Sequence, residues 1–411
     1  MKSPSFSSPP VNDDVLSDRA IADPHQFFKD LREIDPVYFS QRHGVYILTG
    51  HAEVHAAFRD KRLSSARAMQ GFRGKLGNKY QQVLKRALQL LDGWMLLNDP
   101  PDHTRLRDPV RKTFTPAVAD SLIPRISARV KQLMAQFEQT APVDIVREFS
   151  HPLTALVICD LLGVEEQDQD FLRDWTRDFG KLIYGVSSNE SDYAAAVGRA
   201  GEVFYERMRP LLAKRRADPQ DDLISALITA SDQENWTEAE LLGACSMLLF
   251  AGHDTTAALI ASSVRAFCLH ADARRLFVEN PPVHLSAVEE LLRFDGPSKT
   301  FVRVTNEPMQ IGEHEIPAGA HLWLSILGAN HDPSVFSEPE VLDLKRDPNP
   351  HVSFGGGIHF CVGASLARVE ARIALTQLFE RFPKLGLIPG EHQWHKALVD
   401  RSLMSLPVQV V

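Results

Sequence analysis

The chain has 411 residues, of which 44% are hydrophobic and 24% are charged, and its formal net charge is −8. The composition is that of a globular protein with a sizeable core, and the negative charge argues against a general nucleic-acid binder or attraction to an anionic membrane. Residues 1–20 are polar and rich in serine and proline, without the apolar run of a signal peptide or membrane anchor. We therefore expect a flexible tail over residues 1–20, a folded region over 21–411 and a cytoplasmic location.

Strand-like segments are few, and helical patterning dominates. Residues 45–49, 309–317 and 321–324 form short apolar runs interrupted by glycine and proline, which is typical of short strands. Between about 115 and 295 the apolar spacing is mainly helical. Residues 65–95 and 180–200 are mixed in character, and we expect both segments to be irregular or mobile.

His103 and Arg107 follow the sequence Asn-Asp-Pro-Pro at 98–101, which is a favourable helix start, and their spacing places them on one helix face. By itself this pair is equally an ordinary solvated face. Pro109 falls inside the same predicted helix, where it removes a backbone donor and clashes with the carbonyl of Arg105. We therefore expect a kink, which makes the position of Arg107 less certain than that of His103.

A long central helix is predicted from Thr237 to about His270. Thr237 and Glu240 have the spacing of a capping box, and the following residues to Gly252 are apolar on every face, which indicates a buried helix. At about 1.5 Å per residue it would be roughly 50 Å long.

A polar patch interrupts this helix at residues 251–256, Ala-Gly-His-Asp-Thr-Thr. The Thr255 hydroxyl can bond back to the carbonyl of Ala251 and loosen the helix, while the small residues at 251 and 252 leave room beside it. Asp254 and Thr255 together offer an acid and an alcohol for moving protons. The alternative is a polar kink satisfied by water, and we expect His253 to have a packing or ion-pairing role.

The most informative segment is Phe354-Gly-Gly-Gly-Ile-His359-Phe-Cys361-Val-Gly363, directly before a helical stretch. A cysteine at a helix N-terminus favours the thiolate, and the glycines around it let a large flat group approach the backbone. A thiolate facing a flat prosthetic group suggests haem iron. A structural cysteine in a glycine-rich turn is the alternative, and the cysteines at 159, 245 and 268 are expected to pack as small hydrophobic residues.

This decapeptide resembles the cysteine-ligand loop of the cytochrome P-450 family, and all six fixed positions of that loop are filled. The resemblance covers nearly the whole chain. It implies a mostly α-helical single domain with small β-sheets and a long central helix over haem b. It also implies Cys361 as the iron ligand and Asp254 and Thr255 as the oxygen-activating pair. Further haem contacts implied by the resemblance are His103, Arg107, Arg303 and His359 at the propionates, with Phe354, Gly355, Gly363 and Ala251 beside the ring.

The resemblance assigns a structural network to Glu290 and Arg293, spaced i,i+3 on a helix, together with Arg346. Alone, the first two residues are a weak signal, because any surface helix can carry such a pair. The three residues are expected to form a buried charge network that holds the cysteine loop, so removing one would strand the others' charges.

The family also implies a substrate and electron donors. The predicted pocket is mostly apolar and comprises Met247, Phe250, Ala251, Ser298, Lys299, Phe301, Leu403 and Met404, so a largely hydrophobic substrate is expected. Lys299 is either an anchor for an acidic or carbonyl group or a residue that turns outward or pairs with an acid such as Asp295. Electrons would come from NAD(P)H only indirectly, through a ferredoxin or flavodoxin and its reductase. Five basic residues could form a docking patch for that partner: Arg105, Arg111, Lys112, Arg368 and Arg372. The alternative is that these residues form an ordinary solvated face.

Three other functions remain open at this point. A peroxide-driven peroxygenase and a non-catalytic haem ligand sensor would keep the cysteine loop but would not need Asp254 and Thr255. A thiol hydrolase could use Cys361 with His359 as base, but it would not explain the arginines. The expected enzyme is a monomeric haem-thiolate monooxygenase, with secondary-metabolite tailoring as its expected role.

Overall fold

The computed structural model describes residues 11–75, 78–137, 142–164, 169–184, 190–390 and 392–410. Helices predominate in these residues, as the sequence predicted. They are α1 (Asp18–Ala22), α2 (Pro24–Ile34), α3 (His51–Ala57), α4 (Ala66–Lys75), α5 (Asn78–Val83), α6 (Lys85–Asp92), α7 (Asp102–Thr113), α8 (Pro116–Ser121), α9 (Ile123–Met134), α10 (His151–Leu162), α11 (Gln169–Tyr184), α12 (Glu190–Ala217), α13 (Leu223–Gln233), α14 (Glu238–Leu269), α15 (Ala271–Glu279), α16 (His284–Asp295), α17 (Ile326–Asn330) and α18 (Ala364–Arg381).

The strands of the described chain form three small sheets. The largest has the order β1-β2-β8-β5-β3, with β2 and β8 parallel and the other neighbours antiparallel. The three segments predicted as strands correspond to β2, β6–β7 and β8. The bounds are β1 (Val37–Ser40), β2 (Val45–Leu48), β3 (Leu63–Ser64), β4 (Val143–Asp144), β5 (Thr300–Thr305), β6 (Met309–Ile311), β7 (His314–Ile316), β8 (His321–Ser325), β9 (Gly386–Leu387) and β10 (Pro407–Gln409).

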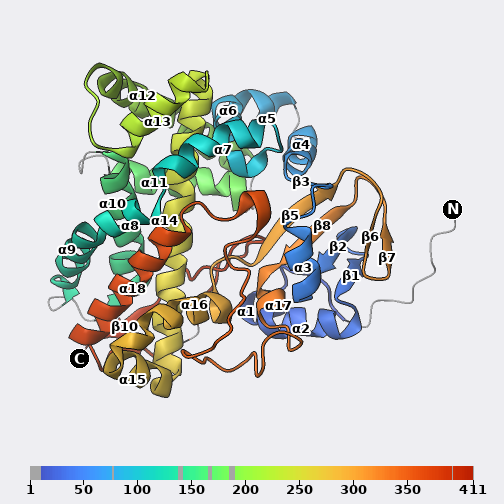
Figure 1. Ribbon diagram of the computed structural model, residues 1–411, viewed down its shortest axis with the longest axis vertical. Coiled ribbons are helices and arrows are strands. Elements are labelled where there is room, and N and C mark those ends of the chain that lie inside the picture. Colours follow the sequence, from blue (N-terminus) through green and yellow to red (C-terminus); the bar gives the residue numbers. More distant parts are fainter. Residues whose placement is uncertain are drawn as a thin grey trace.

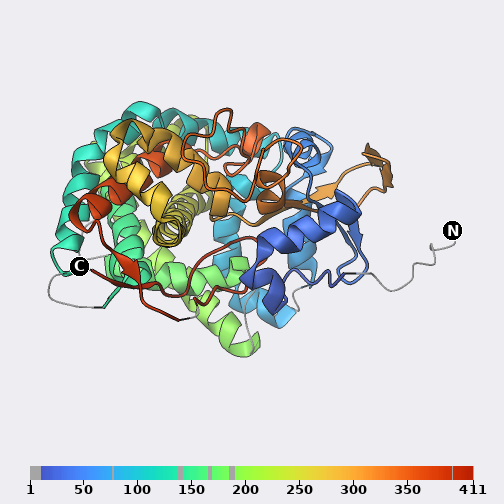
Figure 2. The ribbon, with the colours of Figure 1, turned by 90° about the horizontal axis from the view of Figure 1, so that it is seen from below.

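The helices and the five-stranded sheet occupy two regions of the molecule. In Figure 1, α14 runs through the middle of the helical region, and the sheet lies on the side where the N-terminus emerges. Figure 2 shows α14 (yellow) nearly end-on, with other helices around it. The segment between α17 and α18, which contains the cysteine loop, lies between the two regions.

The central helix α14 begins as predicted. Thr237 Oγ1 accepts a hydrogen bond from Glu240 N, and Glu240 Oε2 accepts one from Thr237 N, so the capping box is complete. Among the described helices, α14 is the one whose length and apolar composition would suit a membrane span. However, 78% of its most apolar 18-residue window is buried inside the protein, which identifies it as a core helix.

The prediction of irregular structure at 65–95 and 180–200 is wrong for most of these residues. The first segment contains α4, α5 and α6, and the second is covered by the end of α11 and the start of α12; residues 76–77 and 185–189 lie outside the described chain. Contact between α6 and α14 depends on two glycines, because a Cβ on Gly243 would lie 2.5 Å from the carbonyl oxygen of Leu90 and 2.6 Å from Gly93 Cα. Helix α6 is also amphipathic, with Ala87, Leu88, Leu90 and Leu91 buried, so its apolar periodicity was a usable signal that the prediction of irregular structure overlooked.

The predicted flexible tail over residues 1–20 includes residues that are folded in the structure. Residues 1–10 lie outside the described chain. Val15 is 2% exposed, α1 begins at Asp18, and Ser40 Oγ donates a 2.6 Å hydrogen bond to the buried Asp13. Residues 13–20 therefore belong to the folded protein.

Pro109 lies inside α7, as predicted, and the helix continues through it to Thr113. The missing proline N–H leaves the carbonyl of Arg105 without its usual helical donor. Trp236 Nε1 donates to that carbonyl at 3.3 Å, so a side chain from outside the helix satisfies it. His103 and Arg107 both precede the proline in sequence and belong to the same helix.

Candidate functional site

The loop before α18 turns sharply at its glycines. Gly357 has φ +62°, and a Cβ there would lie 2.2 Å from the carbonyl oxygen of Phe58, so only glycine is accommodated. Cys361 N donates to the carbonyl of Phe354 at 3.0 Å, which closes the loop just before α18 begins at Ala364. The loop thus presents the Cys361 sulfur from a constrained backbone.

The Cys361 side chain is exposed, although the protein surrounds it closely enough that desolvation raises the pKa of its thiol. The backbone amide of Gly363 and the charges of Arg107 and Arg368 act in the opposite direction but are outweighed. The sequence predicted that the helix N-terminus favours the thiolate, but in the structure the effect of burial on the pKa is larger. A bound metal ion would deprotonate the thiol outright.

Space for a large group lies next to this cysteine. A Cβ on Gly363 would meet no atom of the described chain within 4 Å, so packing against the protein does not require glycine there. Glycine instead leaves the surface beside Cys361 open.

Four basic side chains predicted as propionate ligands meet on one side of the loop. His103 and His359 have ring centroids 4.5 Å apart, and Arg107 donates to the carbonyl of Phe360. Burial lowers the pKa of His359 to about 3, and the positive charges of Arg303, His103 and Arg107 add to this effect. The two arginines and burial therefore keep the His359 imidazole neutral, and none of the four side chains forms an ion pair with a carboxylate of the described residues.

Arg303 in β5 shows this most clearly. It is 6% exposed, and burial lowers its pKa to about 10 while the nearby Asp99 acts weakly in the opposite direction. Its guanidinium donates to the carbonyl of Val302, and it forms no ion pair with a carboxylate of the described residues. The His359 Nδ1 is also buried without a hydrogen-bond partner in the described residues. A buried cation without a counter-ion fits an anionic ligand group.

The polar patch of α14 forms another part of the site. Ala251 is exposed in the middle of an otherwise buried helix, which marks open space beside it. The Thr255 hydroxyl donates to the carbonyl of Ala251 at 2.8 Å, as predicted. Asp254 Oδ1 lies 3.5 Å from His253 Nε2, and because burial lowers the pKa of His253 to about 4, this is a polar contact to a neutral ring at pH 7.

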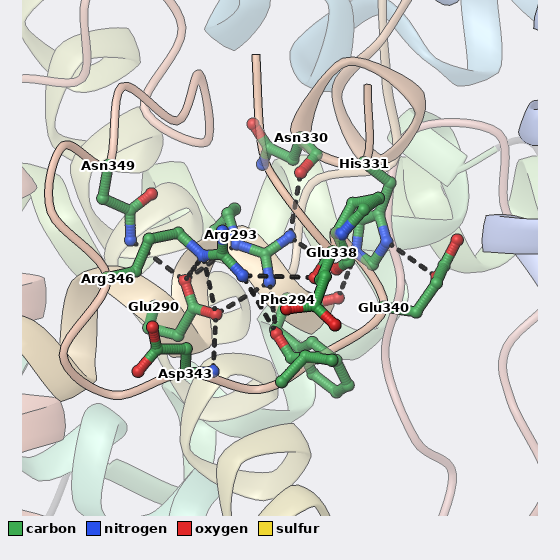
Figure 3. Close-up of polar contacts among 12 residues, drawn as sticks. Glu290, Arg293, Phe294, Asn330, His331, Glu338, Glu340, Asp343, Arg346 and Asn349 are labelled. Carbon is green, nitrogen blue, oxygen red and sulfur yellow. Dashed lines mark hydrogen bonds and ion pairs between the residues drawn. The ribbon is translucent and has the colours of Figure 1, made fainter. Parts of the chain in front are cut away.

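The residues predicted as a charge network lie together in the interior (Figure 3). Arg293 donates to both oxygens of Glu290, at 2.8 and 2.7 Å, and Arg346 Nε reaches the same carboxylate at 3.2 and 3.1 Å. Glu290 and Arg293 are 0% exposed. Asn349 Nδ2 and the backbone N–H of Asp343 also donate to Glu290, so its oxygens are fully used.

Sequence reasoning missed several contacts that hold the loop. Asn330 Nδ2 donates to Ser353 Oγ at 2.8 Å, and Ser353 Oγ donates to the carbonyl of Leu292 at 2.7 Å. Two exposed apolar side chains just before Cys361 in the sequence, Ile358 and Phe360, were also missed. Ile358 and Phe360 alternate in the loop with residues at the fixed motif positions, and this alternation could have indicated them.

The residues predicted for a substrate pocket have different environments. Met247, Phe250 and Leu403 are buried, and Phe250 packs against Trp94 with ring centroids 5.4 Å apart. Ser298 and Phe301 are half-buried, and Phe301 meets the ring of Phe58 edge-on at 5.9 Å. Met404 and Ala251 are exposed.

Lys299 does not pair with Asp295, which instead accepts a 2.5 Å hydrogen bond from Arg401. The Lys299 ammonium donates to the carbonyl of Val15 at 3.3 Å and is 2% exposed. Lys299 therefore holds the N-terminal segment and does not turn outward to solvent.

The predicted basic patch is partly neutralised. Arg105 forms ion pairs with Asp102 and Glu240, and Arg368 is bonded to Glu289. Arg111 and Lys112 are exposed, with Arg111 3.7 Å from Asp108, and Arg372 is half-buried.

The donor set fits haem. A sulfur ligand is presented by a constrained loop, open space adjoins it at Gly363, and two cations, the buried Arg303 and the half-buried Arg107, are available for two carboxylates. With the small-residue segment of a long core helix, these features define the class of haem-thiolate proteins.

Comparisons with known proteins give the family. The family model described as cytochrome P-450 matches residues 279–403. The chain is 34% identical over 398 residues to the biotin biosynthesis cytochrome P-450 of Bacillus subtilis (strain 168), covering 96% of this chain and 98% of the relative. It is 37% identical over 402 residues to the vitamin D(3) 25-hydroxylase of Pseudonocardia autotrophica, with 96% of each covered.

A solved structure agrees. The crystal structure of P-450BioI in complex with hexadec-9Z-enoic acid-ligated acyl carrier protein has a TM-score of 0.87 and 31% identity, covering 96% of this chain and 100% of that chain. The chain belongs to the cytochrome P-450 family, whose fold it shares, and it is a monooxygenase-type oxidoreductase with haem iron as cofactor.

Proposed function

We propose that the protein inserts one oxygen atom from dioxygen into a largely hydrophobic organic substrate, by hydroxylation or epoxidation. The observation that supports this most is the exposed residue Cys361 beside a cluster of four basic side chains, in which the buried Arg303 has no ion-pair partner in the described residues. When bound, haem with a thiolate ligand supplies the chemistry of dioxygen activation and O–O cleavage. Cys361 would be that ligand.

The protein's own residues have separate tasks. His103, Arg107, Arg303 and His359 would bind the propionates, which supply the missing negative charge. Phe354, Gly355, Gly363 and Ala251 would lie against the ring. Asp254 would deliver protons during dioxygen activation, and Thr255, held to the Ala251 carbonyl, would orient the path.

The charge network would hold the cysteine loop. Glu290 joins Arg293 in α16 to Arg346 in the segment before the loop; Glu290 and Arg293 are fully buried, and the Arg346 side chain is 9% exposed. They would therefore be structural and not catalytic, because their polar atoms are used by each other and by backbone carbonyls.

The substrate and the electron supply are inferred together. The predicted pocket residues are mostly apolar, which supports a hydrophobic substrate and, by family habit, a role in tailoring secondary metabolites. Two electrons per turnover would come from a ferredoxin or flavodoxin and its reductase, with NAD(P)H as the indirect source. The exposed Arg111, Lys112, Ile358 and Phe360 would contribute to that docking face. We further propose a monomer in the cytoplasm.

A spin-state titration tests the substrate class. Matched hydrophobic acids and their methyl esters are added to the purified ferric protein, and the shift of the haem absorption band is followed. Acids alone shifting the band would indicate a cation in the pocket, whereas equal shifts would indicate recognition by shape. The absence of a haem band from correctly folded protein would overturn the proposed function.

Oxygen-driven and peroxide-driven turnover must also be compared. Product formed with a ferredoxin system and dioxygen supports the monooxygenase. Product formed only with hydrogen peroxide would indicate a peroxygenase, and band shifts without product in either reaction would indicate a ligand sensor.

A further inference from the structure

A cluster of polar side chains lies where the start of α10 packs against the middle of α14. His151 is the first residue of α10, and His253 and Asp254 are consecutive in α14. His151 Nδ1 lies 3.2 Å from His253 Nε2, while Asp254 Oδ1 lies 3.5 Å from His253 Nε2 and 3.8 Å from His151 Nδ1. These three atoms form a compact triangle that includes the carboxylate assigned to proton delivery.

The hydrogen bonds determine which nitrogens carry protons. The Thr154 hydroxyl donates to the carbonyls of Ser150 and His151, at 3.1 and 3.2 Å. Its oxygen, 3.3 Å from His253 Nδ1, is therefore left to accept a hydrogen bond from an N–H at that nitrogen. The neutral His253 ring then has a bare Nε2, so His151 must donate to it from Nδ1.

The two rings differ in access to solvent. The side chain of His253 is 5% exposed, whereas that of His151 is 32% exposed. Burial lowers the pKa of both rings to about 4, so both are neutral at pH 7. The other titratable groups that act on His151 are His395 on the C-terminal segment and Asp144, besides Asp254 and His253.

We propose that His151 passes protons from solvent to Asp254, and that His253 is a positioning residue that holds His151 in the donating tautomer. This rests on the proposed function, because Asp254 is the acid of the monooxygenase reaction. In each transfer, His151 Nε2 takes one proton from water while Nδ1 gives one to the carboxylate. After the transfer, His151 carries its proton on Nε2. The half-exposed ring then loses this proton to water, takes another from water on Nδ1 and donates to His253 Nε2 again. This return step moves no further proton to Asp254.

The residues of this path come from two helices that meet only in the folded protein. A purely structural role would need only the hydrogen bond between the rings, and a glutamine could replace it. Proton transfer requires an imidazole, because an amide does not exchange protons at this rate. The glutamine variants therefore separate the two roles.

The experiment compares the His151→Gln and His253→Gln holoenzymes with the parent and with Asp254→Asn. The control is His284→Gln, because His284 is likewise half-buried, begins a helix (α16) and bonds to the Phe277 carbonyl. We expect His151→Gln to lower product per dioxygen consumed roughly tenfold, to raise peroxide release and to increase the solvent isotope effect. Turnover with hydrogen peroxide, which brings its own protons, should be retained.

A second measurement does not depend on turnover. Nitrogen-15 NMR of labelled histidines in the diamagnetic ferrous–carbonyl form should show Nδ1–H tautomers for both His151 and His253. Nε2–H on His253, or parental coupling and isotope effect in His151→Gln, would overturn the relay alone. A parent that forms no oxygen-driven product would overturn the proposed function and the relay with it.

Discussion

Glu289 in α16 and Arg368 in α18 are joined by two hydrogen bonds, from Arg368 Nε at 2.6 Å and from Nη2 at 2.9 Å. His351 Nε2 lies 3.0 Å from the same carboxylate. The pair links the helix that carries the buried charge network to the helix that follows Cys361. It therefore connects the two ends of the scaffold around the loop.

This pair predicts a dependence of stability on pH. Burial acts to raise the pKa of Glu289, but the contacts from His351 and Arg368 outweigh it and lower the pKa to about 2. The stabilisation is therefore complete above the ordinary pKa near 4.5 and is lost as the pH falls towards 2. The side chain is 30% exposed, so we expect roughly 1–3 kcal/mol after solvent screening.

Glu289→Gln should flatten the acid side of the profile of unfolding free energy against pH, measured by urea titration. Asp272→Asn is the control, because Asp272 is 89% exposed and pairs with Arg275 on the surface. A profile for Glu289→Gln that matches the parent between pH 2 and 4.5 would contradict the assignment.

Glu290→Gln should destabilise the protein strongly. It leaves Arg293 and Arg346 without a carboxylate in the interior, and breaking a buried ion pair costs about 3–5 kcal/mol. Asn349→Ala removes only a 3.1 Å amide contact to Glu290 and should cost about 1 kcal/mol. Urea denaturation measures both values, and equal losses in the two variants would show that the buried charge is not the dominant factor.

Arg303→Met should have opposite effects on the protein with and without haem. The buried guanidinium has no ion-pair partner in the described chain, so its removal should stabilise the haem-free protein. The holoprotein should lose haem more than tenfold faster to a haem-scavenging globin, because a propionate loses its cation. Arg62→Met is the control, since Arg62 is paired with Asp60 and 43% exposed; unchanged haem release in Arg303→Met would exclude Arg303 as a propionate ligand.

Lys299→Met distinguishes the two roles considered for this lysine. Burial lowers the pKa of Lys299 to about 8, so the folded state binds the proton less tightly than the unfolded state. Its penalty is complete below pH 8 and disappears as the pH rises through 10.5. We expect the variant to be more stable at pH 7 by about 1–3 kcal/mol, with a gain that shrinks above pH 8.

The same variant should bind acids and their methyl esters as the parent does, because the ammonium faces the Val15 carbonyl. Selective loss of acid binding in the spin-state titration would instead restore Lys299 as a substrate anchor.

Features formed within one segment were predictable from the sequence. The capping box of α14, the bond from Thr255 to the Ala251 carbonyl and the pair of Glu290 with Arg293 each join residues three or four positions apart. Helix geometry alone brings such residues together. The cysteine loop was predictable for a related reason, since its glycines are required by the local backbone and by the space beside it.

Contacts between segments distant in the sequence were decided only by the tertiary structure. The basic cluster combines α7, β5 and the cysteine loop, and the proposed relay combines α10 with α14. Lys299 was uncertain for the same reason, because the carbonyl it meets belongs to Val15, 284 positions earlier. Periodicity shows which face of a helix is buried but not which other element covers it. The sequence by itself therefore determined the core helix and the glycine-rich loop that presents Cys361, whereas packing decided which charges surround them.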